Sequence, residues 1–209
     1  MSPTIGLVMA LAAAAGHSFR ADFPAAAVKE TGAGGRLIQA TGFSAPGLGS
    51  TPQAAAHAFL RRYGADFGIT ARQQLAARRN PHPGQVVAVT FERRIDGRPV
   101  FDADVVVGVD STGAVILVNA SDVPTRISGK AVISGGAALR AAKAAIPGLE
   151  GGGEATVERG WRGWVDVIRP VWRVDFVATR PPGDWRTYVD AQTGKVLLRM
   201  DRRASFAKP

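Results

Sequence analysis

The strongest constraint on the fold is a two-residue turn signal, Asp96-Gly97, which separates two apolar segments. An Asp-Gly pair tolerates the positive φ angles of a tight hairpin turn. Val86 to Phe91 leads towards the turn, and after it apolar residues recur at every second position. These are Phe101, Ala103, Val105, Val107 and Val109. Because side chains alternate between the two faces of a strand, the pattern predicts an antiparallel hairpin with one face in a core. A third strand is predicted from Val115 to Val118.

Asp102 and Asp104 fall on the other face of the predicted return strand, about 7 Å apart. A pair of carboxylates can perform acid and base work in glycoside hydrolysis. The same alternation is also the ordinary pattern of a solvent-facing sheet surface. We favour the solvent-facing interpretation for both residues.

A helix is predicted before this hairpin, running to Tyr63. Ser50 offers a hydroxyl cap, Pro52 suits the first turn, and Gln53 stands three residues after Ser50 as a capping-box partner. Apolar residues follow at helical spacing, and Gly64 is predicted to end the helix. The predicted buried face consists of Ala56, Phe59, Leu60 and Tyr63.

The second half of the chain repeats this order. Ser134 is predicted to cap a short helix with Leu139, Ala142 and Ile146 on one face, ended by Pro147-Gly148. Strands are predicted at 155–159, 164–167, 171–177, 186–189 and 195–200. Residues 109–116 and 189–196 also share a strand, an acidic turn opener, a glycine and a second strand. Common turn chemistry could produce this match, whereas the shared order favours tandem use of one design.

A helix and a sheet that each have one apolar face can cover one another. We therefore predict an α+β fold with two tandem units, each a helix packed on an antiparallel sheet. Residues 124–131 are predicted to link the units. Residues 19–49 are interpreted as an extended lead-in, with one short strand at Arg36 to Gln39.

The chain begins with an apolar run from Ile5 to Ala15. The run is too short to span a bilayer, which takes about 20 apolar residues. Small residues at Ala13 to Ala15 suit cleavage of a signal peptide, here residues 1–18, although no Lys or Arg precedes the run. The alternative is a buried alanine-rich helix. We expect export to the periplasm or the exterior, and no membrane span.

Composition removes several classes of enzyme. The chain has no cysteine, so it has no disulfide, no thiolate metal site and no cysteine nucleophile. Its three histidines, His17, His57 and His82, lack the spacing of a helical zinc-peptidase motif. His57 also has no serine or cysteine partner in any motif and is interpreted as a surface or partly packed residue. We therefore predict no catalytic residue, no metal and no cofactor.

The charge is strongly positive, with 26 basic residues against 17 acidic ones and a net charge of +9. The positive charge reflects either an arginine-rich composition spread over a solvated surface or attraction to an acidic partner. Four tryptophans also lie among arginines, a combination that can bind single-stranded nucleic acid. They are Trp161, Trp164, Trp172 and Trp185. Because tryptophans on strands more often fill cores, a polyanion-binding module is only the alternative reading.

The first unit resembles the propeptide domain of fungalysin-type and thermolysin-type metallopeptidases (FTP), and the second resembles a PepSY domain. The FTP resemblance rests on residues 56–60, 67–69, 89–91, 96–107, 109–110 and 113–115. The PepSY resemblance rests on Trp172-Arg173-Val174 and on residues 188–197. The predicted domains are residues 50–123 and 131–201.

The resemblance implies two cystatin-like units without catalytic activity of their own. Such a pro-region assists the folding of a zinc metallopeptidase catalytic domain and inhibits it until removed. The partner could be joined in cis or bound in trans. A third possibility is an envelope module that only interacts with other proteins.

The basic tail at residues 202–209 could lie along the substrate groove of such a peptidase. Arg202, Arg203 and Phe206 are the candidate contacts. The alternative interpretation of this segment is a frayed terminus.

Overall fold

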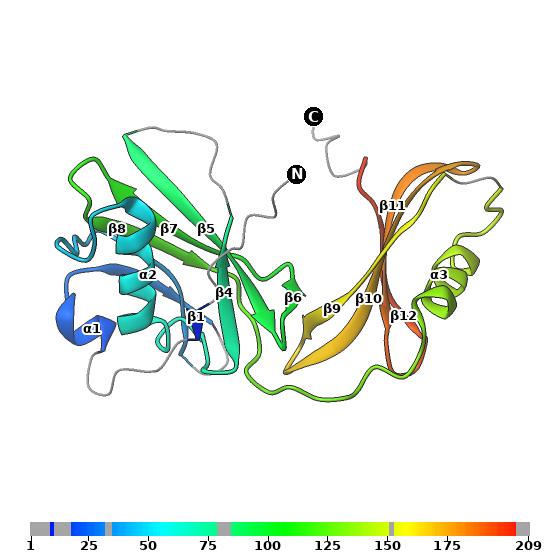
Figure 1. Cartoon of the computed structure of the whole chain (residues 1–209), viewed down its shortest axis with the longest axis horizontal. Helices are drawn as coiled ribbons and strands as arrows, with labels where there is room; N and C mark the ends of the chain where they lie inside the picture. The colour runs from blue at the N-terminus through cyan, green and yellow to red at the C-terminus, as the bar shows by residue number, and fades with distance from the viewer. Residues whose placement is uncertain (1–8, 11–17, 32–34, 79–84, 151–152, 204–209) are drawn as a thin grey trace. The chain divides into compact units, whose positions relative to one another are not determined.

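The computed structural model describes residues 9–10, 18–31, 35–78, 85–150 and 153–203. The fold is mixed α/β, with few helices and many strands (Figure 1). The chain divides into two compact units, Met1–Thr125 and Arg126–Pro209. Each unit places one longer helix against antiparallel strands. Among the helices in the described ranges, none has both the length and the apolar character of a membrane span.

In the first unit, β5 pairs with β4, β6 and β7. The strands of this unit are β1 (Met9–Ala10), β2 (Ala27–Glu30), β3 (Leu37–Thr41), β4 (Gln73–Ala77), β5 (Val86–Ile95), β6 (Arg98–Phe101), β7 (Val105–Asp110) and β8 (Val115–Ala120). Neighbours follow the order β6-β5-β7-β8-β3-β2, while β4 pairs with β5 and β1. Val107 of β7 lies opposite Val89 of β5 and Val118 of β8. These three buried valines place the centre of the core on β5, β7 and β8.

Helix α2 (Pro52–Tyr63) packs on these central strands. Its cap is Thr51, whose Oγ1 accepts a hydrogen bond from the N–H of Ala54 at 3.1 Å. The prediction that Ser50 caps the helix in a capping box is therefore wrong. Pro52 is already the first helical residue, so the capping position is the residue immediately before it. The predicted end of the helix is confirmed.

The Asp96-Gly97 turn is confirmed. Ile95 lies opposite Arg98, and the two residues between them have φ angles of 50° and 72°. Positive φ at both central positions gives the turn the twist that a two-residue hairpin needs.

The return strand is interrupted, which the alternating pattern did not predict. Asp102 has a φ of 58° and separates β6 from β7, so that Glu92 and Arg93 lie opposite residues 100–104. Asp102 and Asp104 therefore do not share one regular strand face, contrary to expectation. The apolar residues of the segment are nevertheless buried, because the extra residues form a bulge that leaves them facing inwards.

Residues 19–49 contribute a helix and two strands where an extended lead-in with one strand was expected. Helix α1 (Phe19–Asp22) places Phe19, fully buried, in an aromatic cluster whose ring centroids lie 5.0 Å (Phe43) to 6.1 Å (Phe59) from its own. The N–H of Phe19 donates to a carboxylate oxygen of Asp66 at 3.0 Å. These elements have four or five residues each, too few to show a periodic pattern in the sequence.

Arg93 is fully buried in the first unit. Its guanidinium donates to the carbonyl oxygens of Ser121 at 3.1 Å and Phe67 at 3.5 Å, and to Gln73 at 3.5 Å. Burial lowers the pKa of Arg93 to about 10, with repulsion from Arg36 as a smaller cause. The group remains charged at neutral pH and joins three separate segments by hydrogen bonds.

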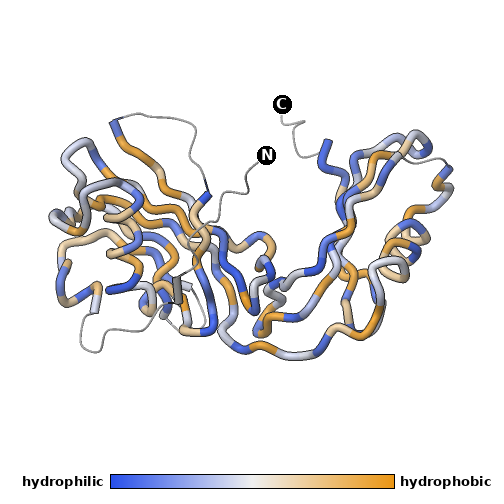
Figure 2. Tube along the Cα trace, viewed as in Figure 1, coloured by the Kyte–Doolittle hydropathy of each residue, from blue (hydrophilic) through white to orange (hydrophobic). Residues whose placement is uncertain are grey.

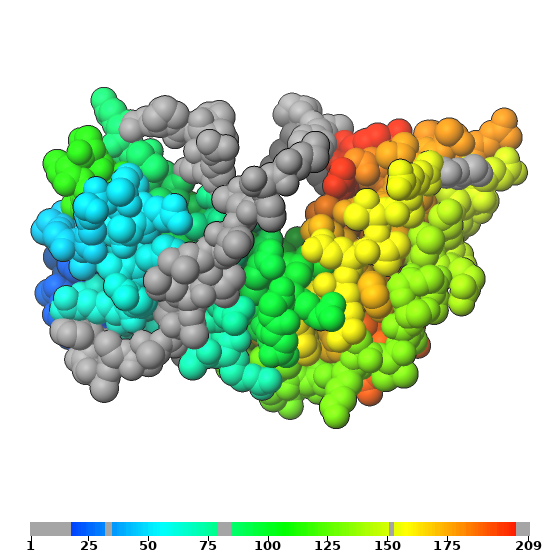
Figure 3. Space-filling view, viewed as in Figure 1, coloured from blue at the N-terminus to red at the C-terminus, as the bar shows by residue number. Residues whose placement is uncertain are grey.

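The second unit has the strand order β12-β11-β10-β9. Its strands are β9 (Thr156–Trp164), β10 (Val167–Thr179), β11 (Pro182–Asp190) and β12 (Val196–Asp201). Helix α3 (Gly135–Ala144) begins after Ser134, whose Oγ accepts from the N–H of Ala137 at 3.2 Å, as predicted. Ala138 and Ala142 of α3 pack with the strands. Figure 2 shows apolar and polar residues alternating along the strands, and Figure 3 shows α3 in yellow-green.

Several predicted boundaries in this unit differ from the structure, since β9, β10 and β11 all extend beyond the predicted strands and α3 ends at Ala144. The strand expected at 164–167 is a turn, because Trp164 lies opposite Val167 and only two residues separate them. The predicted link also belongs in part to the second unit. Ile127 forms a parallel bridge with Ile168, and the N–H of Ile168 donates to the carbonyl of Arg126 at 2.7 Å.

Candidate protein-interaction surface

The sheet of the second unit has two chemically different faces. Trp172, Val174 and Phe176 of β10 pack with α3, so the alternating residues Arg173 and Asp175 project from the opposite face. Strand register extends that face to β9 and β11. We call it the arginine face. Its charged and aromatic members are Glu158, Arg162, Trp164, Arg169, Arg173, Asp175, Arg186 and Tyr188, and on the same face Val167, Val171 and Tyr188 are buried.

A ladder of charges crosses the middle of the arginine face. Arg173 contacts Glu158 of β9 at 2.5 Å and Asp175 at 3.5 Å. Arg186 of β11 binds Asp175 through two nitrogens, at 2.8 and 3.0 Å. This two-pronged geometry suits the planar guanidinium and adds directional specificity. The ladder therefore holds three strands in register with charged rather than apolar groups.

A cation–π arrangement lies beside the ladder. The guanidinium carbon of Arg162 is 4.6 Å from the ring centroid of Tyr188 and 5.4 Å from that of Trp164. Contacts of this kind contribute roughly 0.5–2 kcal/mol, depending on desolvation. Arg162 therefore connects the buried Tyr188 to Trp164 at the end of β9.

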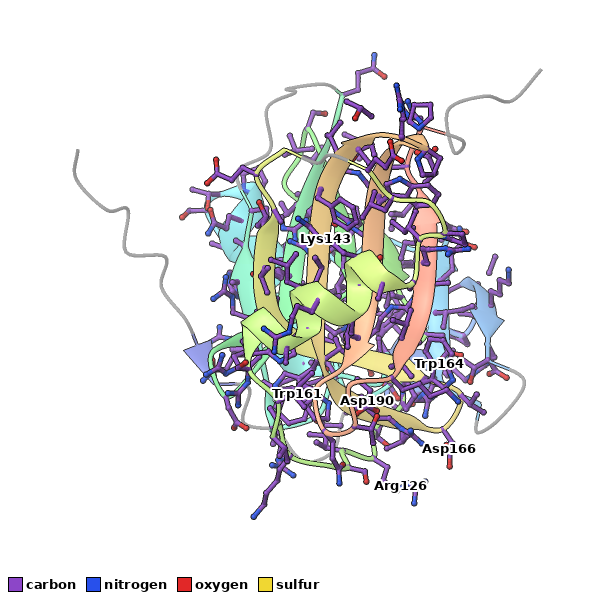
Figure 4. All side chains as sticks on the ribbon, turned by 90° about the vertical axis from the view of Figure 1, so that its right-hand side faces the viewer. Arg126, Lys143, Trp161, Trp164, Asp166 and Asp190 are labelled. Carbon is purple, nitrogen blue, oxygen red and sulfur yellow. The ribbon has the colours of Figure 1, made fainter. Side chains whose placement is uncertain are left out.

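The β9–β10 turn carries an exposed apolar residue in an unfavourable conformation. Val165 has a φ of 51° and is 92% exposed. For a β-branched side chain the left-handed region is a genuine outlier, costing roughly 1–2 kcal/mol. Asp166, next in the turn, pairs with Arg126 at 2.7 Å. Figure 4 shows Trp164, Asp166 and Arg126 at the same end of this unit.

The tryptophans divide between the two faces. Trp172 and Trp185 pack on the core beneath α3, and Nε1 of Trp172 donates to the carbonyl of Ile133 at 3.1 Å. Trp164 lies on the arginine face. The clustering of tryptophans and arginines in the sequence is thus partly a core pattern rather than one continuous basic and aromatic surface.

The predicted tail contacts are only partly described by the structure. Arg202 binds the carboxylate of Asp184 at 2.7 and 3.1 Å, and Arg203 pairs with Asp201 at 3.1 Å. Phe206 lies outside the described residues. Both arginines are engaged at the end of the sheet, and a contact of the tail with a peptidase remains a prediction.

Asp104 and His57, both considered for catalysis in the sequence, have partners within the first unit. Asp104 pairs with Arg78 at 3.3 Å. His57 packs edge-on against Phe91, with ring centroids 4.8 Å apart, and burial followed by the charge of Arg61 lowers its pKa. Within the described ranges, no three His, Cys, Asp or Glu side chains are grouped to hold a metal.

A surface hollow of about 290 Å³ lies at the end of α2. Its polar side is formed by Tyr63, whose hydroxyl donates to Asp22 at 2.6 Å, and by Arg62, which contacts the same oxygen at 3.0 Å. Burial, followed by the hydrogen bond to Asp22, raises the pKa of Tyr63 to about 12. This network ties α1 to the end of α2.

The turn at Val165 was missed in the sequence because valine is not a turn residue, and the segment was read as a strand. The available signal was Asp166, a turn-favouring residue between two apolar stretches. The ladder was missed because its residues are distant in sequence and meet only through strand pairing.

Part of the first unit and most of the second match family models named for peptidase propeptides. Residues 84–121 match the family model of the Fungalysin/Thermolysin Propeptide Motif, FTP. Residues 132–199 match that of the Peptidase propeptide and YPEB domain, PepSY. The chain thus carries an FTP motif followed by a PepSY domain, which confirms the resemblance and its order.

Other similarities are more distant. No match is found among curated proteins. Among solved structures, the Bacillus megaterium YpeB C-terminal domain is similar with 16% identity and a TM-score of 0.34, over 79% of this chain and 71% of that chain.

Proposed function

We propose that this chain is a non-catalytic pro-region module that binds the catalytic domain of a thermolysin-type or fungalysin-type zinc metallopeptidase, assists its folding and inhibits it. The observation that carries the proposal is the FTP motif followed by a PepSY domain. In this proposal the units are cystatin-like, the chain is exported, and the peptidase is held in cis or in trans.

Physical chemistry supports both activities through one set of contacts. A module that binds only the native peptidase stabilises that state by mass action, by about 2.7 kcal/mol at a free concentration one hundred times Kd. The same module excludes substrate if it covers the cleft. The net charge of +9 would speed association with an acidic catalytic domain at low salt.

The direct test is to mix the purified chain with thermolysin or with a fungalysin and measure residual peptide hydrolysis. We expect inhibition that saturates with concentration, together with a higher yield when the unfolded peptidase is refolded in the presence of the chain. Egg-white lysozyme, an unrelated basic protein, controls for charge alone. Unchanged hydrolysis and no complex with either peptidase would contradict the proposal.

The polyanion alternative makes a different prediction. A nucleic-acid or heparin-binding module would be retained on immobilised heparin or single-stranded DNA, and its affinity would fall steeply as salt increases. Retention there without peptidase inhibition would favour that alternative. An envelope interaction module would show neither behaviour.

A further inference from the structure

The β9–β10 turn is unusual because its conformation and its side chain are poorly matched. Glycine is the residue that best tolerates the left-handed region, yet Val165 occupies it with a φ of 51°. A side chain that is 92% exposed gains little from packing within the chain. The folded chain therefore receives no evident compensation for placing valine there. Such outliers concentrate at functional positions, where contacts with a partner can provide the compensation.

The surroundings of Val165 define the chemistry of that partner. Arg162 contacts the adjacent Trp164, and Arg169 lies opposite Arg162 in the strand pairing. Arg126 pairs with Asp166 at the same turn, and Arg169 is exposed on the strand that follows it. An apolar tip bordered by arginines is complementary to an apolar pocket bordered by carboxylates.

We infer that the hairpin tip at residues 164–166 inserts into an apolar, carboxylate-rimmed pocket on the catalytic domain of the metallopeptidase, with Val165 as the anchor. This inference rests on the proposed function and adds the part of the chain that makes the contact. A central apolar anchor surrounded by polar groups is the usual arrangement of an interface hot spot.

The test compares Val165→Gly with Asp96→Gly in the intact chain. Both replace a residue of positive φ at a hairpin tip with glycine, at φ angles of 51° and 50°. We expect both variants to keep or raise the melting temperature, because glycine relieves the conformational penalty. Only Val165→Gly should weaken binding to thermolysin or to a fungalysin, by about tenfold or more. Asp96→Gly should bind within about twofold of the wild type.

Two further variants separate the side chain from the backbone. Val165→Ile keeps the apolar anchor and should retain binding, whereas Val165→Asn tolerates positive φ but is polar and should lose it. Arg169→Glu should slow association and reduce its dependence on salt. Each measurement is a titration of purified thermolysin, and then of a fungalysin, followed by calorimetry.

The outcomes distinguish the proposed contact at Val165 from the proposed binding of a peptidase by the whole chain. Wild-type binding with unchanged binding of Val165→Gly overturns the inference and leaves the proposed function standing. A lower melting temperature for Val165→Gly also overturns it, because valine would then have a structural role. A wild-type chain that binds neither peptidase overturns both.

Discussion

Asp110 and Asp190 hold equivalent positions in the two units: each is the last residue of a strand, and each carboxylate accepts backbone N–H groups of the following turn. The Oδ1 atom of Asp110 accepts from the N–H of Thr112 at 2.9 Å, and that of Asp190 from the N–H of Gln192 at 2.8 Å. The internal similarity of the sequence thus extends to the hydrogen bonds of the turns.

We expect Asp110→Asn to reduce the loss of stability in acid. Hydrogen bonds from the Thr112 hydroxyl and then from the Ala114 N–H lower the pKa of Asp110 from its ordinary value of 3.8. The carboxylate therefore stabilises the fold fully above the unfolded-state pKa, and this contribution is lost as the pH falls through the lower folded-state pKa. Asparagine keeps an acceptor oxygen but does not titrate.

The measurement is urea unfolding of wild type and Asp110→Asn at about pH 6 and at about pH 3 or below, a range that brackets the titration of aspartate. The difference in unfolding free energy between the two pH values should be smaller for the variant. An identical difference would show that Asp110 is not linked to the acid sensitivity.

Arg93→Ala should destabilise the first unit by roughly 3 kcal/mol, because it leaves a cavity and removes the donors for the buried carbonyls of Ser121 and Phe67. Arg94→Ala is the comparison, since the neighbouring Arg94 side chain is 37% exposed and its partner Glu92 also pairs with Arg78. That change should cost clearly less than Arg93→Ala, because Glu92 keeps a second arginine partner. Chemical unfolding measures both, and equal losses would contradict a special role for Arg93.

Phe19→Ala should destabilise the first unit by roughly 3–5 kcal/mol, the usual range for removing a buried aromatic ring. Val86→Ala, at a residue that is 46% exposed, should have a much smaller effect. A chain beginning at residue 50 also loses α1, β2 and β3, and its first unit should no longer unfold cooperatively, whereas the second unit should keep its own transition. Cooperative folding of that shortened first unit would instead support a first domain of residues 50–123.

The contact between Asp175 and Arg186 should show a coupling energy of about 1 kcal/mol in a double-mutant cycle with alanine. The reason is that Arg186 binds the carboxylate through two nitrogens, and that the side chains of Asp175 and Arg186 are only 18% and 21% exposed. Arg180 and Glu150, at 77% and 69% exposure, form the control pair. Their coupling should be near zero. Equal couplings for the two pairs would argue against a stabilising ladder.

Long periodic segments and the tight turn were the most predictable parts of the fold, whereas one of the two predicted helix caps was wrong. The helix ending at Tyr63, the cap at Ser134 and the turn at Asp96 followed from local chemistry and agree with the structure. Local rules failed where tertiary contacts decide the outcome. The short elements around Phe19 are stabilised by residues distant in sequence, and the bulge at Asp102 depends on the neighbouring strand.

The candidate surface was less predictable than the fold. Family resemblance indicated the kind of partner but no contact residue. The Arg186–Asp175 pair exists only because β10 and β11 align in one register. Val165 was hidden because its residue type contradicts the turn in which it lies. An exception to the local rules can be seen only once the backbone is known.

The sheet of the second unit has ion pairs on one face and apolar packing against α3 on the other. Sulfate should weaken the ion pairs and strengthen the apolar packing. High ionic strength screens the Arg173 ladder, whereas exclusion of sulfate from apolar surface strengthens the packing beneath α3. Sodium chloride, a weaker salting-out agent, should reveal mainly the first effect. The sheet could therefore loosen on one side in a saline medium while its helical cover stays in place.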